Sequence, residues 1–205
     1  MQTILFILFG YLSGSILYAR IFSNVFRKEN MIENSKDQNP GAANAFKYGG
    51  FWCGALTLIC DLLKGFIPVF FYMRYIMIHF RPVVLATSLV LASPVIGHAF
   101  PLFYKWKGGK GITVTFGCLL GLLPIWQPFA TLAAFFIFFS LVFRITPHFY
   151  RTLIAYFCSL LCMACLVTET NIWIGFLFIT AAVYLRMAAS SEEKEKMKVR
   201  ILWMH

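Results

Sequence analysis

The chain has 205 residues, of which 60% are hydrophobic and only 13% carry a charge, and its formal net charge is +10 at pH 7. An ordinary soluble domain has roughly a quarter of its residues charged, so this composition excludes a water-soluble globular domain and a disordered chain. Apolar runs of about 18 residues or more recur, and a helix of that length can cross the hydrocarbon of a membrane. We therefore expect one integral membrane domain over residues 1–205, folded as an all-α, polytopic transmembrane helix bundle.

The apolar segments predict about seven spans, which are, in chain order, Thr3–Phe22, Phe51–Tyr72, Val83–Tyr104, Ile112–Leu123, Ile125–Phe143, Thr152–Thr168 and Ile172–Leu185. The first has no basic residue ahead of it and no small-residue cleavage site, so we expect it to be retained as a span. The fourth is too short to cross alone at about 1.5 Å per residue, and Pro124 ends it. We therefore expect a half-helix or a steeply packed helix there, an element that often lines a site at membrane depth.

The basic residues indicate the orientation of the bundle. A chain this hydrophobic is not a nucleic-acid binder, so its excess lysine and arginine must lie in the loops, where they report topology and attract anions. With seven spans and an external N-terminus, the outer loops keep only Arg74 and Arg81, and the other loop cations face the cytoplasm. This bias predicts an N-out, C-in topology.

Two further features allow simple predictions. Residues 190–205 form a basic cytoplasmic tail, either a short amphipathic helix with Met197, Ile201, Leu202 and Trp203 toward the lipid, or a frayed charged end. The six cysteines all lie in apolar runs, where they act as small hydrophobic residues. Three of them share one helix face, but no histidine or second cysteine pair accompanies them, so we predict no metal site and no cofactor.

Two glycine-rich polar stretches fall on the predicted cytoplasmic side. The first runs from Asp37 to Asn44 (DQNPGAAN) and is followed by Lys47, and the second runs from Lys105 to Gly111 (KWKGGKG). Successive backbone N–H groups in such turns can form an anion nest, and the lysines add charge, so both stretches predict a phosphate site. The second leads directly into the half-helix, whose N-terminal dipole favours the same anion. The alternative is a pair of solvated basic loops. Neither stretch has P-loop spacing, so nucleotide hydrolysis is not predicted.

Three ionisable residues lie close to these stretches or inside a span. His98 comes shortly before the second glycine-rich loop, where it is either a satisfied hydrogen-bonding residue or a catalyst beside the phosphate site. Asp61 and Lys64 fall near the middle of the second span, where ionisable groups are costly and normally pair. They either pair with each other, or Asp61 holds Lys64 toward an anionic ligand.

These motifs resemble a known family. The stretch from Gly97 to Gly111, GHAFPLFYKWKGGKG, resembles the G-H-x-F-P-x-F-x-x-F-K-G-G-K-G stretch of the PlsY family, the bacterial acyl-phosphate:glycerol-3-phosphate acyltransferases. Asp61–Gly65 resembles that family's D-x-x-K-G, Gly10–Ser15 its G-Y-x-x-G-S, and Asn39–Asn44 the core N-x-G-A-T-N of its first loop. The matches extend from Gly10 to about Gly117 in the family's order.

The resemblance implies a seven-helix enzyme of the bacterial inner membrane with its site toward the cytoplasm. Its reaction would transfer a fatty acyl group from acyl phosphate to the 1-hydroxyl of glycerol 3-phosphate, giving lysophosphatidic acid and phosphate. The implied catalytic residue is His98. The glycine loop with Lys107 and Lys110 would hold the donor phosphate, and the Asn39–Asn44 loop with Lys47 the acceptor or the oxyanion. The substrate-binding residues are expected to be Asn39, Gly41, Asn44, Lys47, Asp61, Lys64, Lys107, Gly108, Gly109, Lys110 and Gly111.

The chain also departs from the family pattern, with Asp37 for Ser, Gln38 for Gly, Ala43 for Thr, Lys47 for Arg, Met187 for His and Ser190 for Asn. A carboxylate beside a phosphate site is unfavourable, and lysine lacks the bidentate grip of arginine. We therefore expect an intact donor half and an altered acceptor half. The alternatives are a divergent paralogue with another acceptor or no activity, which binds acyl phosphate or lipid, and a small transporter that uses Asp61 and Lys64 for coupling. We find no inverted repeat of the kind that transport would favour.

Overall fold

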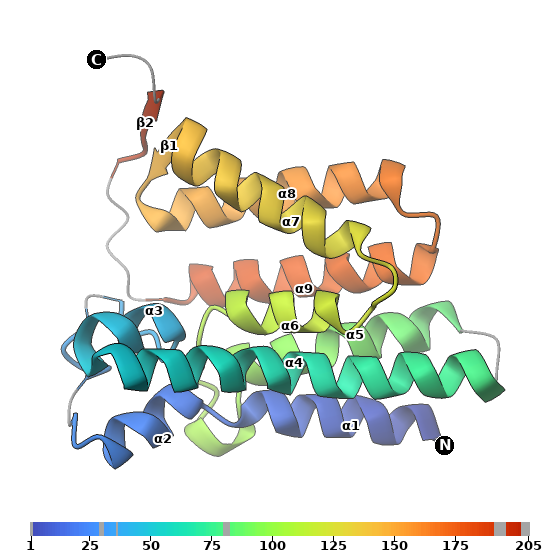
Figure 1. Cartoon of the computed structure of the whole chain (residues 1–205), viewed down its shortest axis with the longest axis horizontal. Helices are drawn as coiled ribbons and strands as arrows, with labels where there is room; N and C mark the ends of the chain where they lie inside the picture. Colours follow the sequence, from blue (N-terminus) through green and yellow to red (C-terminus); the bar gives the residue numbers. More distant parts are fainter. Residues whose placement is uncertain (1, 29–30, 36, 80–82, 191–195, 202–205) are drawn as a thin grey trace.

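The computed structural model describes residues 2–28, 31–35, 37–79, 83–190 and 196–201. These residues form a helix bundle with one short two-stranded ribbon, so the predicted all-α membrane bundle is confirmed (Figure 1). In this described part, five segments are long and apolar enough to cross a membrane, namely Gln2–Val25, Phe51–Ile76, Val84–Tyr104, His148–Leu166 and Thr170–Ala188. The other two predicted spans correspond to shorter elements, the helix Ile112–Leu120 and the apolar run Gln127–Val142.

The elements follow one another as α1 (Gln2–Ser15), α2 (Tyr18–Val25), α3 (Ala42–Asn44), a π turn (Ala45–Gly49), α4 (Phe51–His79), α5 (Val84–Ala99), a 3₁₀ turn (Leu102–Tyr104), α6 (Ile112–Leu120), α7 (Gln127–Ile137), a π turn (Phe138–Val142), β1 (Phe143–Thr146), α8 (His148–Leu166), α9 (Thr170–Ala188) and β2 (Lys198–Ile201). The predicted half-helix is α6, which has nine residues. The second predicted span is longer than expected, since α4 runs past Tyr72.

The first predicted span, Thr3–Phe22, is broken in the structure. α1 ends at Ser15 and α2 begins at Tyr18, so the backbone leaves the helical path at Ile16 and Leu17. The break opens the carbonyl of Ile16 to a donor from another helix, and Nζ of Lys64 on α4 donates to it over 2.7 Å. The apolar run alone did not reveal the break, because its partner lies 48 positions further along the chain.

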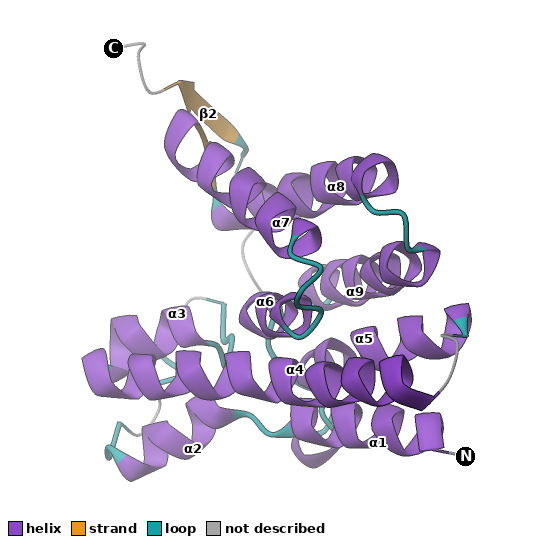
Figure 2. Cartoon of the chain, turned by 45° about the vertical axis from the view of Figure 1, so that its right-hand side comes forward, coloured by secondary structure: helices purple, strands orange, loops and turns teal. Residues whose placement is uncertain are grey.

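The helices pack in layers around α5. α5 contacts α1 on one side and α9 on the other, α4 crosses α1 and α6, and α7 with α8 forms an outer pair (Figures 1 and 2). The largest core cluster contains Leu91 of α5, Leu119 of α6 and Phe176 of α9. Within it the hydroxyl of Tyr156 donates to Oγ1 of Thr115 over 2.9 Å, which ties α8 to α6. These contacts hold α6 with its N-terminus toward the end of the bundle that carries the glycine loop.

The C-terminal tail forms a strand that the sequence did not suggest. β2 (Lys198–Ile201) pairs antiparallel with β1 (Phe143–Thr146). The two predictions for this segment, an amphipathic helix and a frayed end, are therefore both wrong for these residues. Basic residues alternate with Val199 and Ile201, and this period of two suits a strand better than a helix. Leu202 and Trp203 lie outside the described residues.

The crossing of α4 and α6 depends on a backbone contact. A Cβ placed at Gly117 of α6 would meet the carbonyl oxygen of Leu62 of α4, which is backbone and cannot rotate away. Glycine therefore sets the separation of these two helices, as small residues do at many membrane helix interfaces. The same crossing positions the start of α6.

We expect Gly117→Ala to separate α4 from α6 and to destabilise the protein by about 1–3 kcal/mol, the usual effect of overpacking. The measurement is thermal unfolding of the purified protein in detergent, with Leu63→Ala as the control, because Leu63 is 44% exposed on α4. A Gly117→Ala protein that melts at the wild-type temperature would contradict this account of the crossing.

Candidate active site

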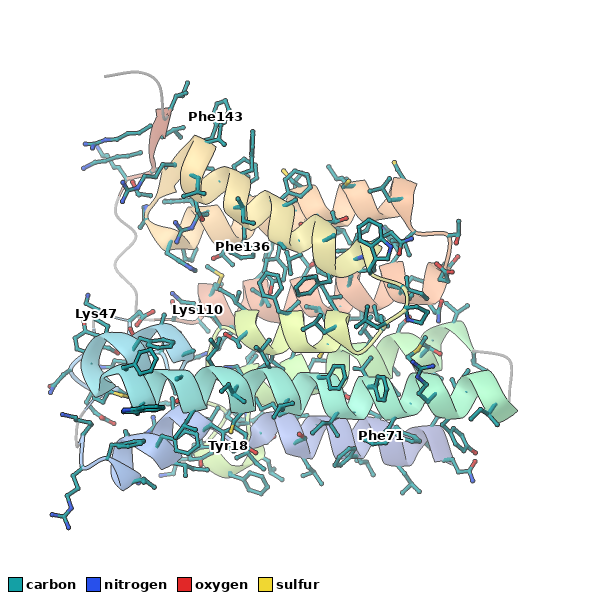
Figure 3. All side chains as sticks on the ribbon, viewed as in Figure 1. Tyr18, Lys47, Phe71, Lys110, Phe136 and Phe143 are labelled. Carbon is teal, nitrogen blue, oxygen red and sulfur yellow. The ribbon has the colours of Figure 1, made fainter. Side chains whose placement is uncertain are left out.

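The two glycine-rich loops meet at one end of the bundle. Oδ1 of Asn39 accepts a hydrogen bond from the backbone N–H of Lys110 over 3.0 Å. The ammonium of Lys110 forms an ion pair with Oδ2 of Asp37 over 2.9 Å, and only 8% of the Lys110 side chain is exposed. Figure 3 shows Lys110 at the same end of the bundle as Lys47. The two stretches that the sequence predicted as separate phosphate sites therefore form one site.

Asp37 is held by further contacts within its own loop. Its Oδ1 accepts a hydrogen bond from Nδ2 of Asn44 over 2.7 Å and one from the backbone N–H of Asn39 over 3.3 Å. Burial acts to raise the pKa of the Asp37 carboxyl, but the hydrogen bonds and the charge of Lys110 outweigh it and hold that pKa below its usual value. Asp37 is therefore ionised at neutral pH and serves as an internal anion for Lys110.

A cavity of about 550 Å³ opens beside this ion pair. The N-terminus of α6 forms part of its wall, through Ile112 and Thr113, and the first N–H groups of a helix have no partner within the helix. Such an N-terminus favours an anion. The predicted site residues that line this cavity are Asn39, Gly41, Asn44, Lys47, Asp61, His98, Lys110 and Gly111. His148, which the sequence analysis missed, also lines it, and no motif marked that residue.

The glycine loop differs from the predicted nest of free N–H groups. The N–H of Gly109 donates to the carbonyl of His98 over 3.0 Å, and the N–H of Lys110 is bonded to Asn39. The nest prediction is therefore wrong for these two groups, because the loop uses them to attach itself to α5 and to the first loop. A Cβ at Gly109 would touch Nε2 of His98, so only glycine allows the loop this close to the ring.

His98 is oriented by a buried charged pair. Its Nδ1 lies 2.8 Å from Nζ of Lys64, and that Nζ lies 2.8 Å from Oδ1 of Asp61. An ammonium group can only donate, so Nδ1 of the neutral ring accepts and the ring proton resides on Nε2, beside Gly109. Asp61 and Lys64 therefore pair with each other, and the Lys64 ammonium contacts His98 and does not line the cavity.

A second, smaller cavity of about 230 Å³ lies next to the first. Arg20, Lys107 and Arg186 supply its positive charges, and Asp37 lines both cavities. Nε of Arg186 on α9 donates to the carbonyl of Gly108 over 2.9 Å, which fixes the glycine loop from the opposite side. Arg186 was not predicted as a site residue, although it directly precedes Met187, one of the departures from the family pattern.

All six departures from the family pattern lie at these cavities or behind them, since Met187 is in the core and the others line a cavity, namely Asp37, Gln38, Ala43, Lys47 and Ser190. Gln38, which replaces a glycine of the family motif, has a φ of 45°, in the left-handed region that glycine adopts most easily. Ser190 lines the smaller cavity, whereas Met187 is fully buried in the core. Gln38 thus has a backbone conformation that suits glycine, and at position 187 a methionine in the core stands where the family pattern has a histidine.

The fold and the site define a multi-pass membrane protein with two neighbouring cavities at one end of its helix bundle, the smaller of which is lined by more cations than carboxylates. The family model described as glycerol-3-phosphate acyltransferase matches residues 4–194. The chain belongs to the glycerol-3-phosphate acyltransferase family.

Individual relatives agree with this assignment. A glycerol-3-phosphate acyltransferase of Mycoplasma pneumoniae is 35% identical over 126 residues, which are 57% of this chain and 52% of the relative. One of Pseudoalteromonas translucida is 41% identical over 120 residues, 58% of this chain and 56% of the relative. The chain thus spans about half the length of the curated relatives it matches.

A solved structure shares the fold. The crystal structure of PlsY, an integral membrane glycerol 3-phosphate acyltransferase, in its glycerol 3-phosphate form matches with a TM-score of 0.73 at 23% identity, over 92% of this chain and 89% of that one. The lysophosphatidic acid form of PlsY matches with a TM-score of 0.72 at 22% identity, over 91% and 88% of the two chains.

We expect Arg186→Met to loosen the glycine loop, because the carbonyl of Gly108 loses its donor. Hydrogen exchange followed by mass spectrometry should show amide exchange in residues 108–111 that is about tenfold faster, with α4 unchanged. Arg74→Met, near the other end of α4, is the control and should leave the loop at the wild-type rate. If Arg186→Met exchanges like the wild type, Arg186 does not hold the loop.

Proposed function

We propose that the protein is a membrane acyltransferase of phospholipid biosynthesis, which transfers a fatty acyl group from acyl phosphate to the 1-hydroxyl of glycerol 3-phosphate. The products are lysophosphatidic acid and phosphate. The observation that carries the proposal is the meeting of two loops around the buried ammonium of Lys110, beside a cavity. Both substrates carry phosphate, so a buried cation at one end of the bundle can pair with either substrate. Membership of the family supports the same chemistry.

The larger cavity suits the donor phosphate. Lys110 and Lys47 supply positive charge to it, and the N-terminus of α6 adds unpaired N–H groups. Among the described residues no carboxylate pairs with Lys47, whose Nζ lies over the ring of Tyr48 at 5.1 Å. Gly108 and Gly109 let the loop approach closely. The fatty tail of the donor then lies along the apolar outer faces of the helices, in lipid.

The smaller cavity suits the acceptor. Arg20, Lys107 and Arg186 line it, and three cations exceed the two carboxylates, Asp37 and Glu33, that share it. We therefore assign glycerol 3-phosphate to this cavity and not to the Asn39–Asn44 loop with Lys47. Because Asp37 lines both cavities, the two substrates would meet at its side chain.

The reaction itself needs little covalent help from the protein. The hydroxyl oxygen of glycerol 3-phosphate bonds to the acyl carbon, the bond between that carbon and the phosphate oxygen breaks, and the hydroxyl proton ends on the released phosphate. Acyl phosphate is an activated mixed anhydride, so positioning and charge stabilisation supply most of the catalysis. His98, with its proton on Nε2, acts as a hydrogen-bond donor to a substrate oxygen. A substrate phosphate is the base.

The site faces the cytoplasm in this proposal, and the protein resides in the bacterial inner membrane. The distribution of loop cations supports an N-out, C-in orientation, because most of them belong to the end that carries the cavities. Membrane lipid surrounds the bundle. The proposed mechanism invokes no nucleic acid, metal or cofactor.

A second candidate is a paralogue of this family that has changed its acceptor or lost turnover. The observation in its favour is the acceptor side, where Met187 is buried and Ser190 replaces a larger polar residue at the smaller cavity. Such a protein would still bind acyl phosphate. Release of phosphate without lysophosphatidic acid would identify this candidate.

The first test is turnover of purified protein with long-chain acyl phosphate and glycerol 3-phosphate, following phosphate and lysophosphatidic acid. We expect both products in equal amounts. Lys110→Ala should reduce kcat/KM by at least about 100-fold, because a charge-assisted contact is lost from a buried site. Lys105→Ala is the control, since Lys105 is exposed on the same loop and lines neither cavity. Unchanged kinetics in a folded Lys110→Ala protein would remove Lys110 from the site.

The second test concerns Asp37. Asp37→Asn keeps a side-chain oxygen that can accept the hydrogen bonds from Asn39 and Asn44, but it removes the negative charge beside Lys110. We therefore expect the KM for acyl phosphate to fall about three- to tenfold. Because the pKa of Asp37 is lowered, this effect should be constant from pH 6 to pH 9.

The control for Asp37 is Glu33→Gln, which removes a carboxylate that lines the smaller cavity and not the larger one. It should leave the donor KM within about twofold of the wild type. A rise in the donor KM for Asp37→Asn would show that the carboxylate positions Lys110 for the substrate and does not compete with the phosphate.

A further inference from the structure

The ribbon formed by β1 (Phe143–Thr146) and β2 (Lys198–Ile201) has two different faces. Its register places Arg144 opposite Arg200 and Thr146 opposite Lys198. Residues that face each other across a strand pair point to the same side, and alternate residues point to opposite sides. One face of the ribbon is therefore basic, and the other is apolar.

The basic face lacks a negative partner in the part of the chain that the structure describes. The ion pairs there join Glu33 to Arg20, Asp61 to Lys64 and Asp37 to Lys110, so none involves the ribbon. Like charges directly opposite each other destabilise a strand pair. A nearby arginine adds to the charge, since Arg151 of α8 lies within electrostatic reach of Arg144 and its Nε is buried without a hydrogen-bond partner. Among the described residues this register is thus unfavourable unless an anion covers the face.

The ribbon lies at the end of the bundle that carries the candidate active site. β1 leads directly into α8, and His148, the first residue of α8, lines the larger cavity. Figure 3 shows Phe143 at that end of α7, toward the same side as Lys110 and Lys47. The basic face is therefore close to one membrane surface, the one onto which the cavity opens.

The apolar surroundings of the ribbon suit lipid. Ile145 is buried against the bundle, but Val199 on the same face is 50% exposed, and Phe143 is 38% exposed. Leu141, just before β1, is 59% exposed. Basic residues beside exposed apolar residues are typical of elements that lie in the interface of a membrane, with cations at the headgroups and apolar side chains below them.

We propose that the β1–β2 ribbon binds the headgroups of anionic phospholipids, in the leaflet onto which the cavity opens. The phosphates of the lipid supply the negative charge that Arg144, Arg200 and Lys198 lack, and the acyl chains contact Phe143 and Val199. The proposal stands apart from the acyltransferase activity, because it rests on the register, the charge, the exposed apolar residues and the position of the ribbon.

The test is binding of phosphatidylglycerol to the full chain in neutral detergent, counted by native mass spectrometry, with phosphatidylcholine as the neutral lipid. Each basic residue near an anionic surface changes affinity about fivefold, so Arg144→Gln with Arg200→Gln should weaken phosphatidylglycerol binding about 10- to 30-fold. Arg27→Gln with Lys28→Gln, two exposed cations outside the ribbon, is the matched control and should change it less than about threefold. Phosphatidylcholine should bind weakly and equally to all three proteins.

A thermal measurement separates the ribbon's role from a folding defect. Phosphatidylglycerol should raise the melting temperature of the wild type and not that of the Arg144→Gln, Arg200→Gln protein, which should be at least as stable as the wild type without lipid because its like-charge contact is gone. Inorganic phosphate at the same concentration should not reproduce the shift. Each of three results would overturn the proposal. They are equal phosphatidylglycerol binding by the wild type and the variant, a wild-type melting temperature that phosphatidylglycerol does not change, and a shift with inorganic phosphate as large as that with the lipid.

Discussion

The buried ammonium of Lys110 is the charge on which the site depends. The Lys110 ammonium is buried at one end of an apolar bundle, and a buried charge needs a counter-ion and hydrogen bonds. Asp37 provides the counter-ion over 2.9 Å, and the backbone of the same lysine is bonded to Asn39. The two contacts draw the first loop onto the second, and the larger cavity forms where the loops and the start of α6 meet. Removal of either loop would leave the other without its partner.

This arrangement gives a physical explanation for several departures from the family pattern. Asp37 stands where the family has a serine, and its carboxylate forms the ion pair with Lys110. Gln38 has a left-handed backbone, a conformation that suits the glycine of the family pattern better than glutamine. Arg186 holds the glycine loop through the carbonyl of Gly108, and its neighbour Met187 is part of the core. The change at position 37 thus alters the charge beside Lys110.

Much of the bundle could be predicted from the sequence, because a span is a local property of about twenty residues. The short α6, the two polar loops and the place of His98 beside the second loop followed from runs of residues close in the chain. Features that depend on contacts between residues far apart in the sequence could not be predicted. The break at Ile16 frees a carbonyl that accepts a hydrogen bond from Lys64. The amides of the glycine loop bond to His98 and Asn39, and β2 pairs with β1, which lies far from it in the sequence. The nest and tail predictions failed for this reason.

The claim that both loops form one phosphate site can be tested most directly by nuclear magnetic resonance of protein labelled with ¹⁵N in lysine and asparagine. The ligand is a non-hydrolysable acyl phosphonate, and the two signals are the backbone amide of Lys110 and the side-chain amide of Asn44, which belong to different loops. The account predicts that both signals shift during the titration with the same dissociation constant. A shift of one signal without the other, or of neither at saturating ligand, would contradict it.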